Sequence, residues 1–169
     1  MLTILVQSGN YFNELENEKS LRIAKTALHH SIELNDDVLI AKSYNLIGLN
    51  FDEYLYPDKA IEYYEKGIKH ANLTENDSIK QWLYNNLGNV FAYNKVNITK
   101  SILYYKKALS YANIINDEVE INYIKQNIAS AYFAEKKYNI GKIYLDEISS
   151  YVLRNGQVEA RMTYYSLLG

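Results

Sequence analysis

The histidines are the first residues in this chain that could do chemistry, and their spacing argues against a metal site. His29 and His30 are adjacent, so on a helix their side chains point about 100° apart and cannot share one metal ion as a pair four residues apart does. His70 stands alone near an expected helix end, where the helix dipole stabilises an imidazolium. Because a metal site needs several converging ligands, we expect structural or solvated histidines and no bound metal.

Two acidic runs are the next candidates, Asp36-Asp37 and Asp117-Glu118. Paired carboxylates can carry out acid–base catalysis, but acids that precede an apolar helical pattern are typical of helix N-caps. The 169 residues include no cysteine, no phosphate-binding glycine loop and no nucleophile elbow. We therefore expect no enzyme activity and no cofactor, with an enzyme site as a remote alternative.

The composition narrows the class of partner. Hydrophobic residues make up 48% and charged residues 22% of the chain, a mixture typical of soluble globular proteins. A net charge of -2 argues against nucleic acid, which requires a clustered basic surface. No apolar run approaches the roughly 18 residues that span a membrane. The absence of cysteine suits either redox compartment; we expect the cytoplasm, with the periplasm as the alternative.

The elements that would position any site come from a repeat. A polar interruption typical of a helix start recurs at intervals of 39 to 41 residues, at Asn35-Asp36-Asp37, Asn76-Asp77-Ser78, Asn116-Asp117-Glu118 and, more weakly, Asn155-Gly156. An apolar signature recurs with it: Tyr44 to Phe51 is nearly copied at Tyr84 to Phe91. A period of this length predicts a stack of similar structural units.

Each unit is expected to be a pair of helices. In the second unit, the first helix runs from about Asp37 to Asp52 and its partner begins at Pro57, which is favoured at the first helical position. Small residues let the two helices approach closely, and large aromatics fill the space around the contact. Upstream, we expect Met1–Phe12 to be the remnant of one helix and Glu18–Leu28 to belong to the next. The expected packing residues are Ala41, Tyr44, Ile47, Gly48, Phe51, Ala60, Tyr64, Gly67 and Ala71.

The third unit contains one extra residue, which we place in the connection Asn94–Asn97, where insertions cost least. In the fourth unit Ala129 takes the position of Gly48 and Gly88. A fifth unit begins and stops at Gly169. Because the chain ends inside a motif, we expect it to be a piece of a longer protein.

This pattern resembles the tetratricopeptide repeat (TPR) family. The matching residues are Tyr44, Ile47, Gly48, Phe51, Ala60, Tyr64 and Gly67, then Tyr84, Leu87, Gly88, Phe91, Ser101, Tyr105 and Ala108. The period of 40–41 rather than the usual 34, and a missing proline after the second helix, set it apart. Such long repeats are similar to those of kinesin light chain and of bacterial peptide-sensing and signalling regulators. The resemblance implies an all-α fold, an α-solenoid of antiparallel helix pairs wound into a right-handed superhelix. It would form one array of units at about 1–40, 41–80, 81–121 and 122–161, with a partial unit at 162–169.

The resemblance also implies that the first helix of each pair lines a concave surface. The residues expected to face this groove are Lys42, Asn45, Leu49, Asp52 and Glu53, then Trp82, Asn85, Asn89, Ala92 and Tyr93, then Tyr123, Gln126, Ser130, Phe133 and Ala134, and finally Ser166. One position carries Asn45, Asn85, Gln126 and Ser166 in successive units, and we call these four the amide row.

Side-chain amides can pair with any peptide backbone, and aromatics provide anchoring area. The leading hypothesis is therefore a non-catalytic module that binds an extended peptide or partner helix, as the sensory or scaffold region of a larger bacterial regulator. The alternative for the amide row is a set of solvated polar residues. Apart from Lys42 the groove is neutral at the positions where relatives clamp a terminal carboxylate, so that function is not expected. The alternative function is a homodimer formed by the array ends, where Leu167 and Leu168 lie, or by the convex face.

Overall fold

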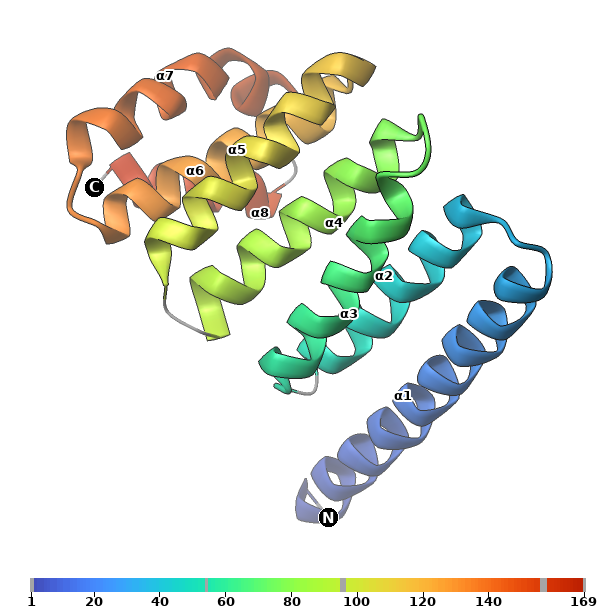
Figure 1. The fold of residues 1–169 in the computed structure, drawn as a ribbon. Coiled ribbons are helices and arrows are strands. Elements are labelled where there is room, and N and C mark those ends of the chain that lie inside the picture. The colour runs from blue at the N-terminus through green and yellow to red at the C-terminus, as the bar shows by residue number, and fades with distance from the viewer. Residues whose placement is uncertain (1, 54, 95–96, 156–157, 169) are drawn as a thin grey trace. The chain divides into compact units, whose positions relative to one another are not determined.

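The computed structural model describes residues 2–53, 55–94, 97–155 and 158–168, with side chains described for 18–53, 55–94, 97–155 and 161–167. Throughout the described residues the secondary structure is helical, without strands. The chain is an all-α helical repeat of antiparallel pairs, which confirms the predicted fold class (Figure 1). It divides into two compact units, Met1–Thr74 and Glu75–Gly169.

The first unit comprises α1 (Leu2–Glu33), α2 (Asp37–Glu53) and α3 (Pro57–Ala71). Helix α2 packs against both α1 and α3. The backbone of α1 is one continuous helix, so the predicted break between Phe12 and Glu18 is wrong. The intervening residues contain no proline or glycine and include the strong helix formers Glu14, Leu15 and Glu16, so nothing local ends the helix.

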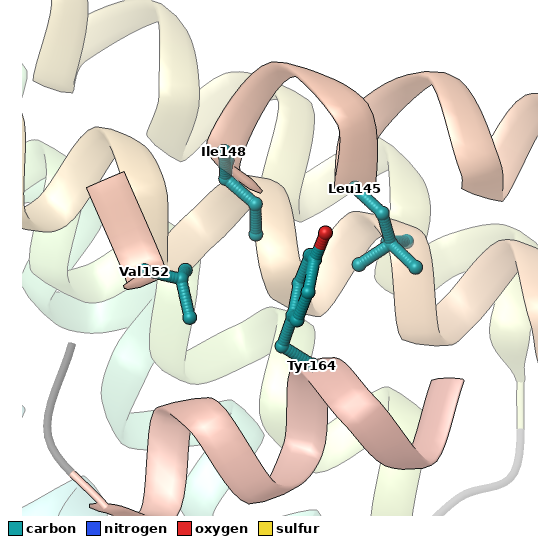
Figure 2. Close-up of a cluster of buried hydrophobic side chains, with 5 residues drawn as sticks. Leu145, Ile148, Val152 and Tyr164 are labelled. Atoms are coloured by element: carbon teal, nitrogen blue, oxygen red, sulfur yellow. The ribbon is translucent and has the colours of Figure 1, made fainter. Parts of the chain in front are cut away.

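The second unit comprises α4 (Asp77–Asn89), η1 (Val90–Asn94), α5 (Ile98–Ile115), α6 (Glu118–Ala134), α7 (Tyr138–Asn155) and α8 (Val158–Leu168). Helices α4 and α5 form one pair, α6 and α7 the next, and α8 packs on α7 and α6. Figure 2 shows Tyr164 of α8 pointing between Leu145, Ile148 and Val152 of α7. Burying an aromatic ring among aliphatic side chains fixes α8 on the pair before it.

The predicted helix starts are confirmed, but the asparagines have a different role in two of three places. The side chains of Asp36 and Asp117 accept the N–H three residues on, at 3.0 and 3.1 Å, and Asn76 does the same at 3.1 Å. Asn35 and Asn116 instead have positive φ angles of 51° and 55° and end the preceding helix. Asn35-Asp36 and Asn116-Asp117 thus each close one helix and open the next.

Glycines let a tyrosine ring lie directly on the partner helix. A Cβ on Gly48 would lie 2.5 Å from Cε1 of Tyr64, which belongs to the second helix of the pair. Gly88 stands in the same relation to the ring of Tyr105. Both tyrosines are fully buried. The close approach predicted from small residues therefore serves to seat one aromatic ring in each of these pairs.

The α6–α7 pair reverses this arrangement. Gly141 lies on the second helix, and a Cβ there would lie 2.5 Å from Cδ2 of Phe133 on the first. The ring now comes from the opposite helix, which explains why Ala129 can stand where Gly48 and Gly88 stand in the other pairs. Phe133 was predicted to face the groove, but it packs against the buried cluster shown in Figure 2 because only the glycine leaves room for its ring.

Tyrosine and lysine line the outer seam of the pairs. Tyr84 stacks on Tyr104 and Tyr111, with the Lys107 ammonium 5.1 Å from the centre of its ring. In the next pair Lys125 and Glu147 stand at the positions of Tyr84 and Lys107 and form an ion pair at 2.7 Å. One link between helices is thus made by a cation–π contact and its counterpart by a salt bridge.

The extra residue of the third unit coincides with a π turn. Ile98 follows Phe91 by seven positions, whereas Pro57 follows Phe51 by six. Helix α4 ends in the π turn Val90–Asn94 within that interval, and a π turn holds one more residue than an α turn. The insertion is therefore accommodated at least partly inside the helix rather than in the predicted connection Asn94–Asn97. Residues 95–96 of that connection lie outside the described residues. Gly156, part of the weakest predicted helix start, also lies outside them.

Candidate functional site

The amide row is buried rather than open to a groove. Asn45 and Asn85 are each 7% exposed and Gln126 is 5% exposed. Oδ1 of Asn85 accepts a hydrogen bond from Nδ2 of Asn127, with 3.4 Å between the atoms, which joins α4 to α6. Buried polar side chains need such partners to offset their lost hydration. These three residues are therefore not a ladder that is open to a peptide backbone, and they are not solvated amides either. Of the amide row, only Ser166 is exposed.

Other predicted groove residues divide between internal contacts and the surface. Asn89 is half-buried, and its Oδ1 accepts a hydrogen bond of 2.8 Å from the hydroxyl of Tyr105. Ser130 donates its hydroxyl to a carbonyl one turn back on its own helix at 3.0 Å. In the first unit Lys42 is exposed and Leu49 is 39% exposed. The predicted groove residues Asn89 and Ser130 of the second unit thus already have hydrogen-bond partners within the fold.

Three predicted groove residues keep large exposed aromatic surfaces. Trp82 on α4 is 41% exposed, Tyr123 on α6 is 48% exposed and Tyr93 on η1 is 70% exposed. Burial around its hydroxyl, and then the nearby Tyr123 phenol, raise the pKa of Tyr93. Trp82 and Tyr93 come from α4 and the η1 turn that follows it, and Tyr123 comes from α6. We call Trp82, Tyr93 and Tyr123 the α4–α6 aromatic surface.

Two side-chain contacts hold α4 and α6 side by side. Nε2 of Gln81 donates to Oε2 of Glu120 at 2.9 Å, and the Asn85–Asn127 contact follows one turn further along α4 and two turns further along α6. Residues three and four apart lie on the same helix face, so both contacts belong to one seam. This seam is the scaffold on which the exposed aromatics stand.

Trp82 and Tyr123 flank that seam. Tyr123 lies three residues after Glu120, on the same face of α6. Trp82 directly follows Gln81, the partner of Glu120. Trp82 and Tyr123 are thus the exposed aromatic residues that neighbour the Gln81–Glu120 contact along α4 and along α6.

Glu120 is a functional candidate that the sequence analysis missed. Burial is the main cause that raises the pKa of this carboxyl; the Gln81 hydrogen bond opposes the change and the charge of Asp117 adds to it. Gln81 is fully buried, and its Oε1 has no hydrogen-bond partner. Glu120 was overlooked because an acid in the first turn of a helix is adequately explained by the helix dipole. The sequence signal that could have identified Glu120 is its position three residues before Tyr123, a predicted groove residue.

The lysines of α4 and α6 form ion pairs with acids other than Glu120. Lys80 pairs with Asp77 at 2.9 Å and also lies over the ring of Tyr111. Lys125 pairs with Glu147 on α7. Among the described residues, no lysine or arginine forms an ion pair with Glu120. The half-buried Glu120 carboxylate thus has, among the described residues, a neutral amide as its hydrogen-bond donor and no cation as its ion-pair partner.

Within the described ranges, no three His, Asp or Glu side chains converge as metal ligands do. Over the same ranges, no helix combines the length and the apolar character needed to cross a bilayer. His70 was predicted to lie near a helix end. Its Nδ1 lies 2.7 Å from Oδ1 of Asp37, and this contact links α3 to α2. This contact between helices is structural, which is one of the two roles expected for the histidines.

Comparison with known proteins adds a likeness of fold. No family model matches the chain, and no curated protein matches it in sequence. Among solved structures, it is similar to the crystal structure of BtubC (BKLC) from P. vanneervenii, with a TM-score of 0.69 and 15% sequence identity. The likeness covers 91% of this chain and 59% of that chain, so the present chain corresponds to little more than half of BtubC.

Proposed function

We propose that this chain is a tetratricopeptide-repeat module that binds a peptide or protein partner without catalysis, as the cytoplasmic sensory or scaffold region of a larger bacterial regulator. The single observation that carries the proposal is the α4–α6 aromatic surface. Exposed tryptophan and tyrosine are the side chains that most often anchor protein interfaces. The repeat period and the seating of Tyr64 and Tyr105 on Gly48 and Gly88 support the family assignment.

The burial of Asn85 and Gln126 changes the expected mode of binding. With the amides engaged between helices, the rings of Trp82, Tyr93 and Tyr123 provide most of the contact area. An extended peptide or an amphipathic partner helix can place apolar side chains on such rings at regular intervals. Affinity in this mode comes from a few aromatic anchors rather than from a ladder of backbone hydrogen bonds.

The test is a selection of 12-residue peptides from a displayed random library. Trp82 is the sole tryptophan of the chain, so its fluorescence reports binding of each selected peptide directly. We expect Trp82→Ala combined with Tyr123→Ala to weaken binding at least tenfold, as for loss of two aromatic anchors; for this variant, peptide anisotropy replaces fluorescence. The control is Ile143→Ala with Leu153→Ala, which removes apolar surface exposed on α7 and leaves binding unchanged. Equal loss in both variants would refute this placement of the site.

A homodimer is the second candidate, and α8 is the element that favours it. Met162 and Tyr165 are 67% and 56% exposed there. Leu167, predicted to be exposed, instead packs partly against the cluster of Figure 2, and the side chain of Leu168 lies outside those described. Sedimentation velocity would show a mass that rises with concentration, and Met162→Glu with Tyr165→Glu would remove that rise. A wild-type monomer at all concentrations excludes the dimer.

A further inference from the structure

We propose that the α4–α6 aromatic surface selects peptides that carry a basic side chain, arginine above lysine, with the cation over the rings of Trp82 and Tyr123 and its N–H groups directed to Glu120. This inference rests on the proposed peptide-binding function and specifies its ligand.

The first argument is the unbalanced charge of Glu120. Its burial opposes ionisation, and the hydrogen bond from neutral Gln81 is its only described stabilising contact. An ionised carboxylate that has lost hydration is stabilised most by a cation that also donates hydrogen bonds. A cation brought by a ligand would fill this role, because no described residue does.

The second argument is that the cations nearest the seam are already engaged. Lys80 and Lys125 are the only cations of α4, η1 and α6, and each forms its own ion pair. On α5, Lys100 and Lys107 lie over aromatic rings of the outer seam. The exposed acid Glu118 lies in the same first turn of α6 as Glu120. The formal net charge of α4, η1 and α6 is therefore negative, which attracts a basic peptide and repels an acidic one.

The third argument comes from hydrogen-bonding capacity. Gln81 is fully buried and uses only Oε2 of Glu120, so among the described residues the half-buried carboxylate is the acceptor that a ligand can reach. The orientation of this amide is dictated by chemistry, since only its N–H group can face the carboxylate. Glu120 thus keeps acceptor capacity beyond its bond to Gln81, and a guanidinium contributes five donors.

Arginine fits this surface better than lysine for a geometric reason. Its planar guanidinium can lie flat on an aromatic ring while its edge donates to a carboxylate, and tryptophan is the best ring for this contact. An ammonium can satisfy the carboxylate but stacks less well. The order of preference is therefore arginine, then lysine, then neutral residues, then acids.

The experiment uses the same displayed 12-residue library on the full chain and on Glu120→Gln, which keeps an acceptor for Gln81 but removes the charge. The wild type enriches arginine at one position of the selected peptides, and Glu120→Gln loses this enrichment. For one selected peptide, replacing that arginine by glutamine weakens binding to the wild type about tenfold and to Glu120→Gln less than twofold. Glu118→Gln is the matched control and keeps the arginine preference.

The outcomes separate this inference from the proposed function. If no peptide binds, the peptide-binding function itself fails. If peptides bind through Trp82 without enriching a basic residue, or if the arginine preference survives in Glu120→Gln, only the present inference is overturned. Equal loss in Glu118→Gln and Glu120→Gln overturns the assignment to Glu120, because it shows a diffuse charge effect. Thermal unfolding of each variant verifies that it is folded.

Discussion

The hydroxyl of Tyr105 donates a 2.8 Å hydrogen bond to Oδ1 of Asn89 across the α4–α5 pair. In the α2–α3 pair the equivalent tyrosine is Tyr64, and Leu49 stands where Asn89 does. Leucine offers no acceptor, and the buried Tyr64 hydroxyl has no hydrogen-bond partner among the residues that the structure describes. Burial, and then the charge of Asp52, raise the pKa of Tyr64. The two pairs share one ring packing and differ by a single hydrogen bond.

This difference predicts opposite effects for the same substitution. Tyr105→Phe should lower the free energy of unfolding by about 1 kcal/mol, because it removes a hydrogen bond and leaves Asn89 unpaired. Tyr64→Phe should leave stability unchanged or raise it by about 1 kcal/mol, because it removes a buried hydroxyl that has no partner. Chemical denaturation midpoints measure both, and equal losses would contradict the assignment.

Leu49→Asn should create the missing bond. In the wild-type background the new amide can accept from the Tyr64 hydroxyl, as Asn89 does from Tyr105. In a Tyr64→Phe background no such bond can form. A double-mutant cycle by chemical denaturation should therefore give a favourable coupling of about 1 kcal/mol. No coupling between the two sites would show that the second amide does not reach the hydroxyl.

Gly88→Ala should destabilise the chain, although alanine is the better helix former by about 1 kcal/mol. The added Cβ would overlap the ring of Tyr105, and overpacking of this kind costs roughly 1–3 kcal/mol. In a Tyr105→Ala background the overlap is gone, so the same substitution should become stabilising. Thermal unfolding measures the change, and a loss of the same size in both backgrounds would exclude the ring as its cause.

The Glu120 carboxyl should make stability depend on pH. Because its pKa is raised in the fold, the folded chain holds a proton that the unfolded chain releases near the ordinary value of about 4.3. Stability therefore falls as pH rises through the window above that value, and the deficit persists at neutral pH. Glu120→Gln should flatten this part of the profile and raise the denaturation midpoint at pH 7.

Glu118→Gln is the control for the pH profile, since Glu118 is an exposed carboxylate of the same helix turn. It should leave the fall in stability as it is in the wild type. If Glu120→Gln lowered the midpoint at pH 7, the carboxylate would be stabilising and the raised pKa would be contradicted.

Lys136 follows α6 with a φ angle of 59°, a conformation that disfavours a residue with a Cβ. Lys136→Gly should raise the free energy of unfolding by about 1 kcal/mol, because glycine adopts this conformation without strain. Asn116→Gly is the control: its φ angle is 55°, but asparagine tolerates the left-handed region, so the gain should be smaller. Chemical denaturation compares the two, and equal effects would argue against backbone strain at Lys136.

The helix pairs and their ends could be predicted because their signals are local. The spacing of Gly48 and Gly88 and of Tyr64 and Tyr105 shows which faces pack, and short polar residues mark where helices begin. The predicted break within α1 was wrong, because polar residues alone do not end a helix when the helix propensity of the sequence favours its continuation.

The candidate site was only partly predictable. The aromatic residues Trp82, Tyr93 and Tyr123 are exposed where the repeat suggested, but Asn85 and Gln126 are buried and Phe133 packs on Gly141. Counting positions along a helix gives a direction for each side chain. It does not say how much of that direction a neighbouring helix covers.

By itself, then, the sequence determined the all-α repeat and the pairing of helices, because each depends on residues at a fixed spacing. Only the tertiary structure decided which polar groups have partners. Within the part of the chain that the structure describes, Asn89 is engaged by Tyr105, the Tyr64 hydroxyl has no hydrogen-bond partner, and Glu120 lies half-buried beside Gln81 without a cation. Whether a polar group is satisfied depends on atoms from another helix within about 3 Å, and no periodicity along the chain encodes that distance.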